Sequence, residues 1–308
     1  NLGFVPVNWT TKEVFMDLPI ETKNILANTQ GQPLSHHLFA VGYLAYHIIG
    51  KIKIDNPNLA KSAFIAGILH DLGKIDPQFQ QWVSKKSATP KKTANTDEPE
   101  IIELPDDGVH IDSTVKGLGK FTFETHPRHH EISWLLACSL LKDEFKENKT
   151  LNNKQLMQIL HGIYWHHTRP YRKGGDFLKG DIEDGLLNKS LNGSWDKFNQ
   201  SLIAIFKDIK FLSEKFDKDE VSFSSIIPFW SFQYELTNKE MPDYKEFKFD
   251  KKTDNLTTEE ILPRIKINAL HSLVRMAVIN ADRIISKMSR EDLAEYLAEG
   301  SLIHALDD

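Results

Sequence analysis

The sequence predicts a mainly α-helical protein, and two observations support this fold class. Apolar residues recur at spacings of three and four through most of the 308 residues, whereas sustained alternation of the strand type is hard to find. The composition, 40% hydrophobic and 26% charged, is typical of a globular chain that buries a core. We therefore expect helices packed around one interior.

The apolar spacing places the expected helices along the chain. The last helix also has a start signal, because Ser289 and Asp292 stand three residues apart, as in a capping box. The helices are expected at roughly residues 35–50, 58–72, 128–145, 152–167, 196–215, 260–287 and 290–305.

Two stretches between these helices have the composition of loops. Residues 84–126 are rich in Lys, Thr, Pro and Gly, and "VKGLGKFTFE" within them could form a short hairpin. Residues 168–193 contain "RPYRKGGDF" and further glycines. We interpret both stretches as irregular insertions over one helical core. Residues 1–308 are thus expected to form a single domain, with its core motifs between about 33 and 287.

Composition excludes several classes of protein. No apolar run approaches the ~20 residues that cross a bilayer, and no secretion signal is recognisable, so we expect a cytoplasmic protein without membrane association. The single cysteine, Cys138, excludes an intrachain disulfide and a thiolate metal cage, and its apolar neighbours predict a core position. A net charge of −5 argues against a generally cationic surface. The chain begins with Asn1 rather than Met, which suggests a segment of a longer protein.

Histidines gather at the ends of apolar helical rows. Residues at i, i+4 and i+7 share one face of a helix, and this relation directs histidines from several expected helices toward one interior. Asp282 continues such a row inside a strongly helical, apolar segment. The histidines placed in this way are His37, His70, His130 and His167.

The pair His70-Asp71 in "AGILHDLGK" is the centre of the predicted site. A buried carboxylate without a partner costs several kcal/mol, so Asp71 and Asp282 should each meet a cation, a metal ion or several donors. Imidazole and carboxylate ligands without sulfur suit Mn, Fe, Co, Ni or Zn. Adjacent helical residues point ~100° apart, so His70 can serve one ion while the two oxygens of Asp71 bridge two. Two ions ~4 Å apart acidify a bridging water and bind phosphate oxygens, which suits phosphoester hydrolysis.

Each signal alone also has a simpler explanation. A single buried histidine is more often a hydrogen-bonded core residue than a ligand, and a His-His pair can cap a helix dipole. Lys74, about one turn beyond His70, can contact a phosphate or steady the hydroxide, or it can be a solvated lysine favoured by the helix dipole. The joint pattern of histidines on several helices, the HD pair and a late aspartate favours the metal site.

The motifs "LSHHLFAVGYLA", "AGILHDLGK", "RHHEISWLLA", "IYWHHTRP" and "INADRIIS" resemble the HD-superfamily nuclease of type I CRISPR interference. The resemblance implies an HD-superfamily helical bundle with a dinuclear metal site. In the two His-His pairs it favours His37 over His36 and His130 over His129, each open to a one-residue error. It implies that one ion is held by His37, His70, Asp71 and Asp282, and a second by Asp71, His130, His166 and His167.

The resemblance also implies an activity and partners. The family cleaves single-stranded DNA in antiviral defence, endonucleolytically and exonucleolytically, with two divalent transition-metal ions, which here would be Mn, Fe, Co or Ni. Its partners are a CRISPR helicase, present as a fused domain or a separate subunit, and the Cascade surveillance complex. The alternatives are an HD nucleotide phosphohydrolase, either a dNTPase or a cyclic-nucleotide phosphodiesterase, and a catalytically silent binding module. The extra histidines disfavour the phosphohydrolase, and the ligands present at every motif disfavour the silent module.

A basic loop follows the second His-His pair. Arg169, Arg172 and Lys173 come directly after His166 and His167, and as a hypothesis they line the entrance and guide a DNA strand to the site. A solvated loop is the alternative interpretation. The catalytic residues expected from the sequence are Asp71 and Lys74.

Overall fold

The computed structural model describes residues 22–52, 54, 56–87, 127–141, 151–167, 179–217, 221–227 and 257–307. These residues form helices and no β-strand, and Leu26 and Pro33 make an isolated antiparallel bridge. The mainly α class predicted from the sequence is therefore confirmed. None of the helices in this part of the chain is long and apolar enough to cross a membrane.

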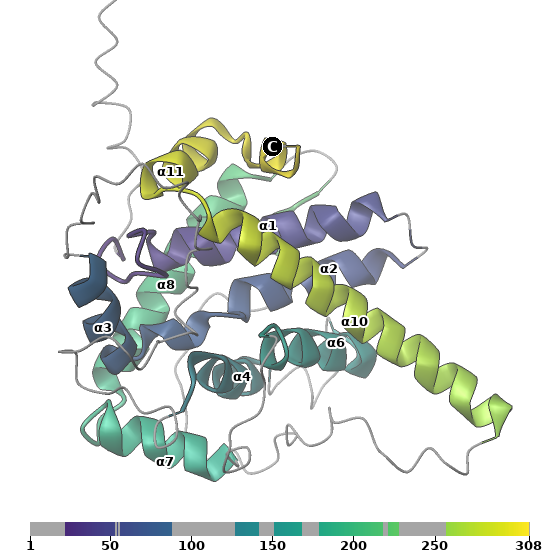
Figure 1. Ribbon diagram of the computed structural model, residues 1–308, viewed down its shortest axis with the longest axis horizontal. Helices are drawn as coiled ribbons and strands as arrows, with labels where there is room; N and C mark the ends of the chain where they lie inside the picture. Colours follow the sequence, from purple (N-terminus) through teal and green to yellow (C-terminus); the bar gives the residue numbers. More distant parts are fainter. Residues whose placement is uncertain are drawn as a thin grey trace, which may run out of the picture.

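The helices follow one another along the chain around a shared apolar core (Figure 1). The longest is α10, with 29 residues, and α8 has 20. The bounds are α1 Leu34–Lys51, α2 Pro57–Leu69, η2 Leu72–Ile75, α3 Pro77–Ser87, α4 His129–Leu140, α6 Asn153–Tyr164, α7 Lys179–Lys189, α8 Asp196–Lys215, α9 Phe223–Ile226, α10 Thr258–Ser286, α11 Arg290–Glu299 and η4 Leu302–Leu306.

The pair α1 and α2 forms the centre of the bundle. Two glycines allow their backbones to touch, because a Cβ atom on Gly67 would lie only 2.6 Å from the Cα atom of Gly42. Such close approach is possible only without a side chain at the crossing. The contact fixes the His37 end of α1 relative to the C-terminal end of α2, where His70 follows.

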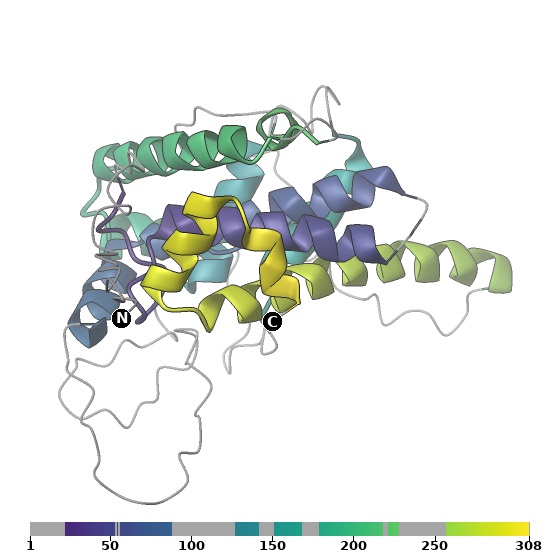
Figure 2. The same cartoon turned by 90° about the horizontal axis from the view of Figure 1, so that it is seen from above.

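Helices α8 and α10 pack against opposite sides of α1 (Figure 2). In α10, the residues that face the bundle are small or β-branched, and Ala277, Val278 and Ala281 are fully buried. α10 also contacts α2 and α6, where Val274 lies beside Gly162. This packing brings Asp282, near the C-terminal end of α10, to the centre of the molecule.

The short 3₁₀ helix η2 is fixed against the start of α4. Gly73 lies against the backbone carbonyl of His129, where any Cβ atom would clash, and its N–H donates to Ser133 Oγ at 2.8 Å. A glycine is therefore required next to the HD pair for a packing reason. This contact sets the position of the His-His pair that begins α4.

Most expected helices are present, with different ends. The capping box of the last helix is confirmed, because Ser289 Oγ accepts from Asp292 N–H at 3.0 Å. That helix ends at Glu299 and not near residue 305, because Gly300 has a left-handed φ of 68° and the chain continues as η4. α6 ends at Tyr164, whereas the expected helix ran to residue 167. His166 and His167 therefore lie beyond the helix.

The two predicted insertions are partly helical. α3 extends to Ser87, past the expected start of the first insertion at residue 84, and α7 occupies residues 179–189 of the second. The expectation of irregular structure is therefore wrong for residues 84–87 and 179–189, which are helical. Both helices have few apolar residues per turn, so periodicity gave little sign of them. The expected hairpin in "VKGLGKFTFE" lies outside the described residues.

Candidate metal centre

The HD pair lies where the chain leaves α2. His70 follows the last residue of the helix, and Asp71 precedes η2, so the two side chains diverge into the interior. Both are buried, with His70 fully inaccessible and Asp71 1% exposed. A change from α-helical to 3₁₀ geometry at this point separates their directions.

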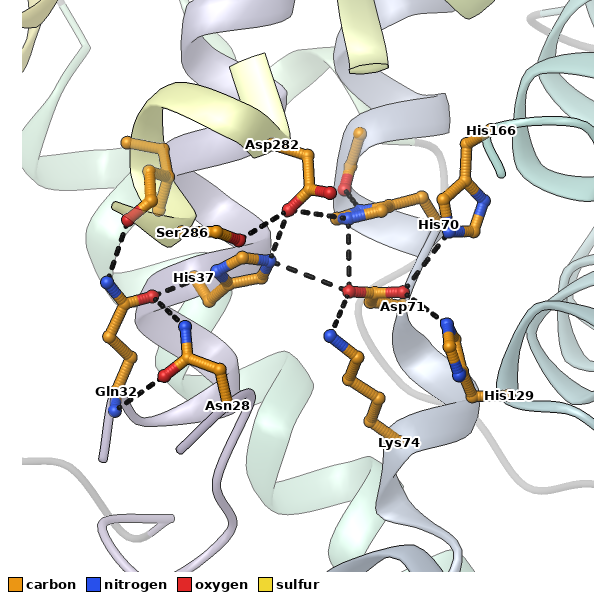
Figure 3. Close-up of polar contacts among 12 residues, drawn as sticks. Asn28, Gln32, His37, His70, Asp71, Lys74, His129, His166, Asp282 and Ser286 are labelled. Atoms are coloured by element: carbon orange, nitrogen blue, oxygen red, sulfur yellow. Dashed lines mark hydrogen bonds and ion pairs between the residues drawn. The ribbon is translucent and has the colours of Figure 1, made fainter. Parts of the chain in front are cut away.

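One oxygen of Asp71, Oδ2, faces two imidazoles (Figure 3). It lies 3.6 Å from His37 Nε2 and 3.3 Å from His70 Nε2. Asp282 Oδ1 lies 3.2 Å from the same nitrogen of His37 and 3.8 Å from that of His70. We call His37, His70, Asp71 and Asp282 the first ligand group; their potential ligand atoms lie within 4.8 Å of one another.

The second oxygen of Asp71, Oδ1, faces a separate set of imidazoles. It lies 3.3 Å from His129 Nε2 and 3.3 Å from His166 Nε2. His129 Nε2 lies 2.6 Å from His167 Nε2. We call Asp71, His129, His166 and His167 the second ligand group, whose potential ligand atoms also lie within 4.8 Å of one another. Asp71 is thus shared by two groups, one on each carboxylate oxygen.

Backbone carbonyls set the orientation of two imidazoles. His70 Nδ1 lies 2.7 Å from the carbonyl oxygen of Gly67, and His166 Nδ1 lies 2.6 Å from that of Ile163. Since a carbonyl only accepts, each Nδ1 must carry a proton, so Nε2 is the nitrogen that holds the lone pair when the imidazole is neutral. These Nε2 atoms are buried, have no hydrogen-bond partner and point at Asp71. Buried imidazole lone pairs that converge on a carboxylate fit a divalent metal ion.

The electrostatics of the first ligand group also favour a cation. Burial raises the pKa of the Asp71 carboxyl, but the neighbouring charges of His70 and Lys74 hold it well below the usual range. For Asp282, burial again raises the pKa, and its contacts with His37 and His70 lower it well below the usual range. Burial lowers the pKa of His70, yet Asp71 and Asp282 raise it to about 10. Two ionised carboxylates therefore attract positive charge at one buried point.

Two imidazoles of the second ligand group, His129 and His167, have lowered pKa values. Burial lowers the pKa of His129 to about 3, although Asp71 opposes this shift. Burial and the neighbouring His166, His129 and His130 lower the pKa of His167 far more than Asp71 raises it. A neutral imidazole is the form that binds a metal ion. The two groups thus differ in charge.

Lys74 is buried and paired, which excludes the alternative of a solvated lysine. Only 2% of the residue is exposed, and its Nζ lies 2.6 Å from Asp71 Oδ2 and 5.7 Å from the centre of the Phe79 ring. Gln80 holds the backbone at this position, because its Nε2 donates to the carbonyl of Lys74 at 2.7 Å. The ammonium group therefore lies beside the shared carboxylate.

The structure separates the members of the two His-His pairs. His37 belongs to the first ligand group, whereas burial and the charges of Arg290 and Lys215 lower the pKa of its neighbour His36 to about 4. In the second pair the structure places His129, and not the predicted His130, in the second ligand group.

The physical reason for the second correction is the packing of η2. Because α4 starts at residue 129 against Gly73, His129 faces Asp71. The ring of His130 packs behind the group, 5.2 Å from the ring of His167 and 5.8 Å from that of Tyr164. Adjacent helical residues point in different directions, and motif spacing alone did not fix the rotation of the helix.

Other predicted and unpredicted residues complete the site. Arg169, Arg172 and Lys173 of the basic loop lie outside the described residues. The sequence analysis gave no role to Ser286, whose Oγ lies 2.9 Å from Asp282 Oδ1, and it missed Gln32, whose Oε1 lies 3.1 Å from His37 Nδ1. Ser286 closes the motif "INADRIIS", one helical turn after Asp282, whereas no motif pointed to Gln32.

A helical bundle with a buried HD pair, further histidines and a late aspartate is the arrangement of an HD domain, and the two ligand groups could hold metal ions. Among protein families, the one described as "Cas3, HD domain" matches residues 27–225. The match covers more than half of the chain, so the chain belongs to the family of Cas3 HD domains, the HD nuclease domains of type I CRISPR systems. The resemblance inferred from the motifs is confirmed. No curated protein and no solved structure matches the chain.

Proposed function

We propose that this protein is a metal-dependent nuclease that hydrolyses phosphodiester bonds of single-stranded DNA, endonucleolytically and exonucleolytically, in CRISPR antiviral defence. The observation that carries the proposal is the position of Asp71, whose two oxygens face two separate groups of imidazoles. A carboxylate placed in this way suits two ions rather than one. Membership of the Cas3 HD family supports the reaction class.

The donor atoms indicate which ions the site would take. The first ligand group offers two imidazoles and two carboxylates, and the second offers three imidazoles and the shared carboxylate. Without sulfur and with several nitrogen donors, this set fits Mn, Fe, Co or Ni better than Mg or Ca. Two such ions, when bound, would supply an activated water and a positive clamp for the phosphate.

The protein's own groups orient this chemistry. Carbonyls of the preceding helical turns hold His70 and His166 in the ligand tautomer, and Lys74 holds Oδ2 of Asp71. Its buried ammonium group adds positive charge next to the reaction centre, where negative charge grows on a phosphate in the transition state. We therefore assign Asp71 as the bridging ligand and Lys74 as an electrostatic partner of the substrate.

The substrate and partners follow from the same reasoning. A site that binds phosphate and reads no base edge suits DNA cleavage with little sequence preference. The basic loop with Arg169, Arg172 and Lys173 is proposed to guide the strand, with a CRISPR helicase and the Cascade complex as the partners that supply it. Replacing all three basic residues with Ala should weaken cleavage and reduce its salt dependence. Cleavage with unchanged salt dependence would contradict the guiding role.

The decisive experiment compares two substrates with one metal-stripped protein. Circular single-stranded DNA and dNTPs are each incubated with Mn, Fe, Co, Ni, Zn or Mg. We expect DNA cleavage with Mn, Fe, Co or Ni, and a loss of more than about 1,000-fold in Asp71→Asn because both ions lose a ligand. Hydrolysis of dNTPs with intact DNA would instead support a nucleotide phosphohydrolase.

A matched variant controls for the loss of a buried carboxylate. Asp208 in α8 is 3% exposed and accepts from the backbone N–H of Thr22 at 3.2 Å and from Ser35 Oγ at 3.2 Å, outside both ligand groups. Asp208→Asn should retain cleavage per folded molecule and bind metal as the wild type does. If Asp71→Asn and Asp208→Asn lost activity equally, general destabilisation would explain the result and the assigned role of Asp71 would be wrong.

A further inference from the structure

We propose that Gln32 is a positioning residue: its side-chain amide fixes the tautomer of His37 and holds the end of α10, so that His37 and Asp282 face the same metal ion. The proposal rests on the two-metal function above. Gln32 is fully buried in the turn before α1, and it connects this turn and His37 of α1 with the end of α10, which is distant in sequence. Figure 3 shows it behind His37, on the side away from Asp71.

A tight turn presents Gln32 to the site. The bridge between Leu26 and Pro33 closes the turn, and Gly31 occupies it with a left-handed φ of 79° that suits glycine. The side-chain oxygen of Asn28 accepts from backbone N–H groups inside the turn, so its amide nitrogen is free to point at Gln32. Backbone groups of this turn therefore orient the side-chain amide of Asn28 toward Gln32.

Hydrogen bonding determines which way the Gln32 amide points. Its Nε2 lies 2.8 Å from the carbonyl oxygen of Ile285 and 2.9 Å from that of Met288. Carbonyls only accept, so the NH₂ group must be on this side and Oε1 on the other. Oε1 then accepts from Asn28 Nδ2 at 2.9 Å and faces His37 Nδ1 at 3.1 Å. Because Oε1 cannot donate, His37 Nδ1 must carry the proton.

The consequence for His37 is that Nε2 is the nitrogen left to bind a metal ion. This atom is buried, has no hydrogen-bond partner and lies 3.6 Å from Asp71 Oδ2 and 3.2 Å from Asp282 Oδ1. For His70 and His166 a backbone carbonyl within the preceding turn sets the same tautomer. For His37 a side chain does so, and a substitution can therefore remove the effect.

The same amide holds α10 in place. The last carbonyls of a helix lack partners within it, and Gln32 donates to the carbonyls of Ile285 and Met288, at and just beyond the C-terminal end of α10. Asp282 lies one turn earlier on the same helix. The family match ends at residue 225, so Gln32 links the matched region to the helix that supplies Asp282.

Two variants separate the two roles of Gln32. Gln32→Met keeps the size but removes both hydrogen-bonding functions, and we expect the ion of the first ligand group to bind about 10–100-fold more weakly. Gln32→Glu keeps an acceptor for His37 but turns an oxygen toward the two carbonyls of α10. It should retain more affinity for that ion, while the amides near residues 285–292 exchange faster with solvent in both variants.

The control is Gln158→Met. Gln158 is a buried glutamine of α6 whose Oε1 accepts from Ser62 Oγ at 3.0 Å, outside both ligand groups. Metal-stripped proteins are titrated with Mn²⁺ or Co²⁺, bound ions per chain are counted by mass spectrometry, and hydrogen exchange is measured on the metal-free proteins. Gln158→Met should bind both ions and leave the exchange near residues 285–292 unchanged.

The outcomes separate the inference from the proposed function. Loss of one ion in Gln32→Met, with the second retained, would support the inference. Two ions bound by Gln32→Met with wild-type affinity, or unchanged exchange at the end of α10, would overturn it. Wild-type protein that binds fewer than two ions would refute the two-metal function instead, whatever the variants do.

Discussion

The two ligand groups share Asp71 but differ in charge and support. The first ligand group contains two carboxylates, and Lys74 pairs with Oδ2 of Asp71, the oxygen that faces this group. Gln32 connects His37 of this group to the end of α10, the helix that carries Asp282. The second contains a single carboxylate and three imidazoles, one from the start of α4 and two from the residues that follow α6. More negative charge at the first group should hold its ion more tightly. We therefore predict two ions of unequal affinity, with the first ligand group filled first.

The largest expected effect in this comparison comes from Asp282→Asn. The change removes the one carboxylate that belongs to the first ligand group alone, and Asp282 is 13% exposed and in contact with both histidines of the group. We expect loss of the first ion and a fall of about 100-fold or more in DNA cleavage, with the second ion retained. Ion counting and cleavage rates check this. If Asp282→Asn lost both ions, the groups would not be independent.

The next prediction tests the membership of the second group. His129→Gln should weaken the second ion and cleavage by about 10–100-fold, because His129 faces Oδ1 of Asp71 at 3.3 Å. His130→Gln is the matched change one residue further along α4, and it should leave both ion affinities within about threefold. Metal titration of the two variants measures the difference. The reverse order of effects would restore the assignment made from the motif.

A pH series sharpens the comparison further. Without metal, Asp71 and Asp282 outweigh burial and raise the pKa of His70 to about 10, above the 6.5 of an unfolded chain. Protonated His70 therefore adds to the free energy of unfolding of the metal-free protein. This contribution is complete below pH 6.5 and is lost as the pH rises toward 10. A metal ion must displace this proton, so the affinity of the first group should rise up to about tenfold per pH unit in that window.

The second group should respond less to pH. Burial already lowers the pKa of His129 to about 3, so no proton has to leave this imidazole between pH 6.5 and 10. Titrations of each ion at pH 7 and pH 8 compare the two slopes. Equal slopes would show that the charge difference between the groups does not control proton competition.

The smallest expected effect is that of Ser286→Ala. Ser286 Oγ donates to Asp282 Oδ1 at 2.9 Å, and the contact is only partly buried. Its loss should weaken the first ion by about 3–10-fold and leave the second unchanged. Ser201→Ala is a control, because Ser201 bonds only locally to the carbonyl of Lys197 in α8. Metal affinities that match in the two variants would remove Ser286 from the site.

Particular residues show how far sequence reasoning reached. Helical periodicity found the helices that carry His37 and Asp282, and the HD pair located the centre of the site. It failed at the second His-His pair, because the rotation of α4 depends on its contact with Gly73. It also left Lys74 undecided, since burial by α3 and η2 is a property of packing and not of local pattern.

By itself the sequence determined the helical class, the HD pair, the capping box at Ser289 and the family, because these depend on residue types at short spacing. Only the tertiary structure decided that the two oxygens of Asp71 face different histidines, that His129 is nearer than His130, and that Gln32 lies behind His37. These are relations between segments up to about 250 residues apart, such as Gln32 with Ile285. Local propensity sets directions within one helix, whereas distances between helices follow from the packing of the whole core.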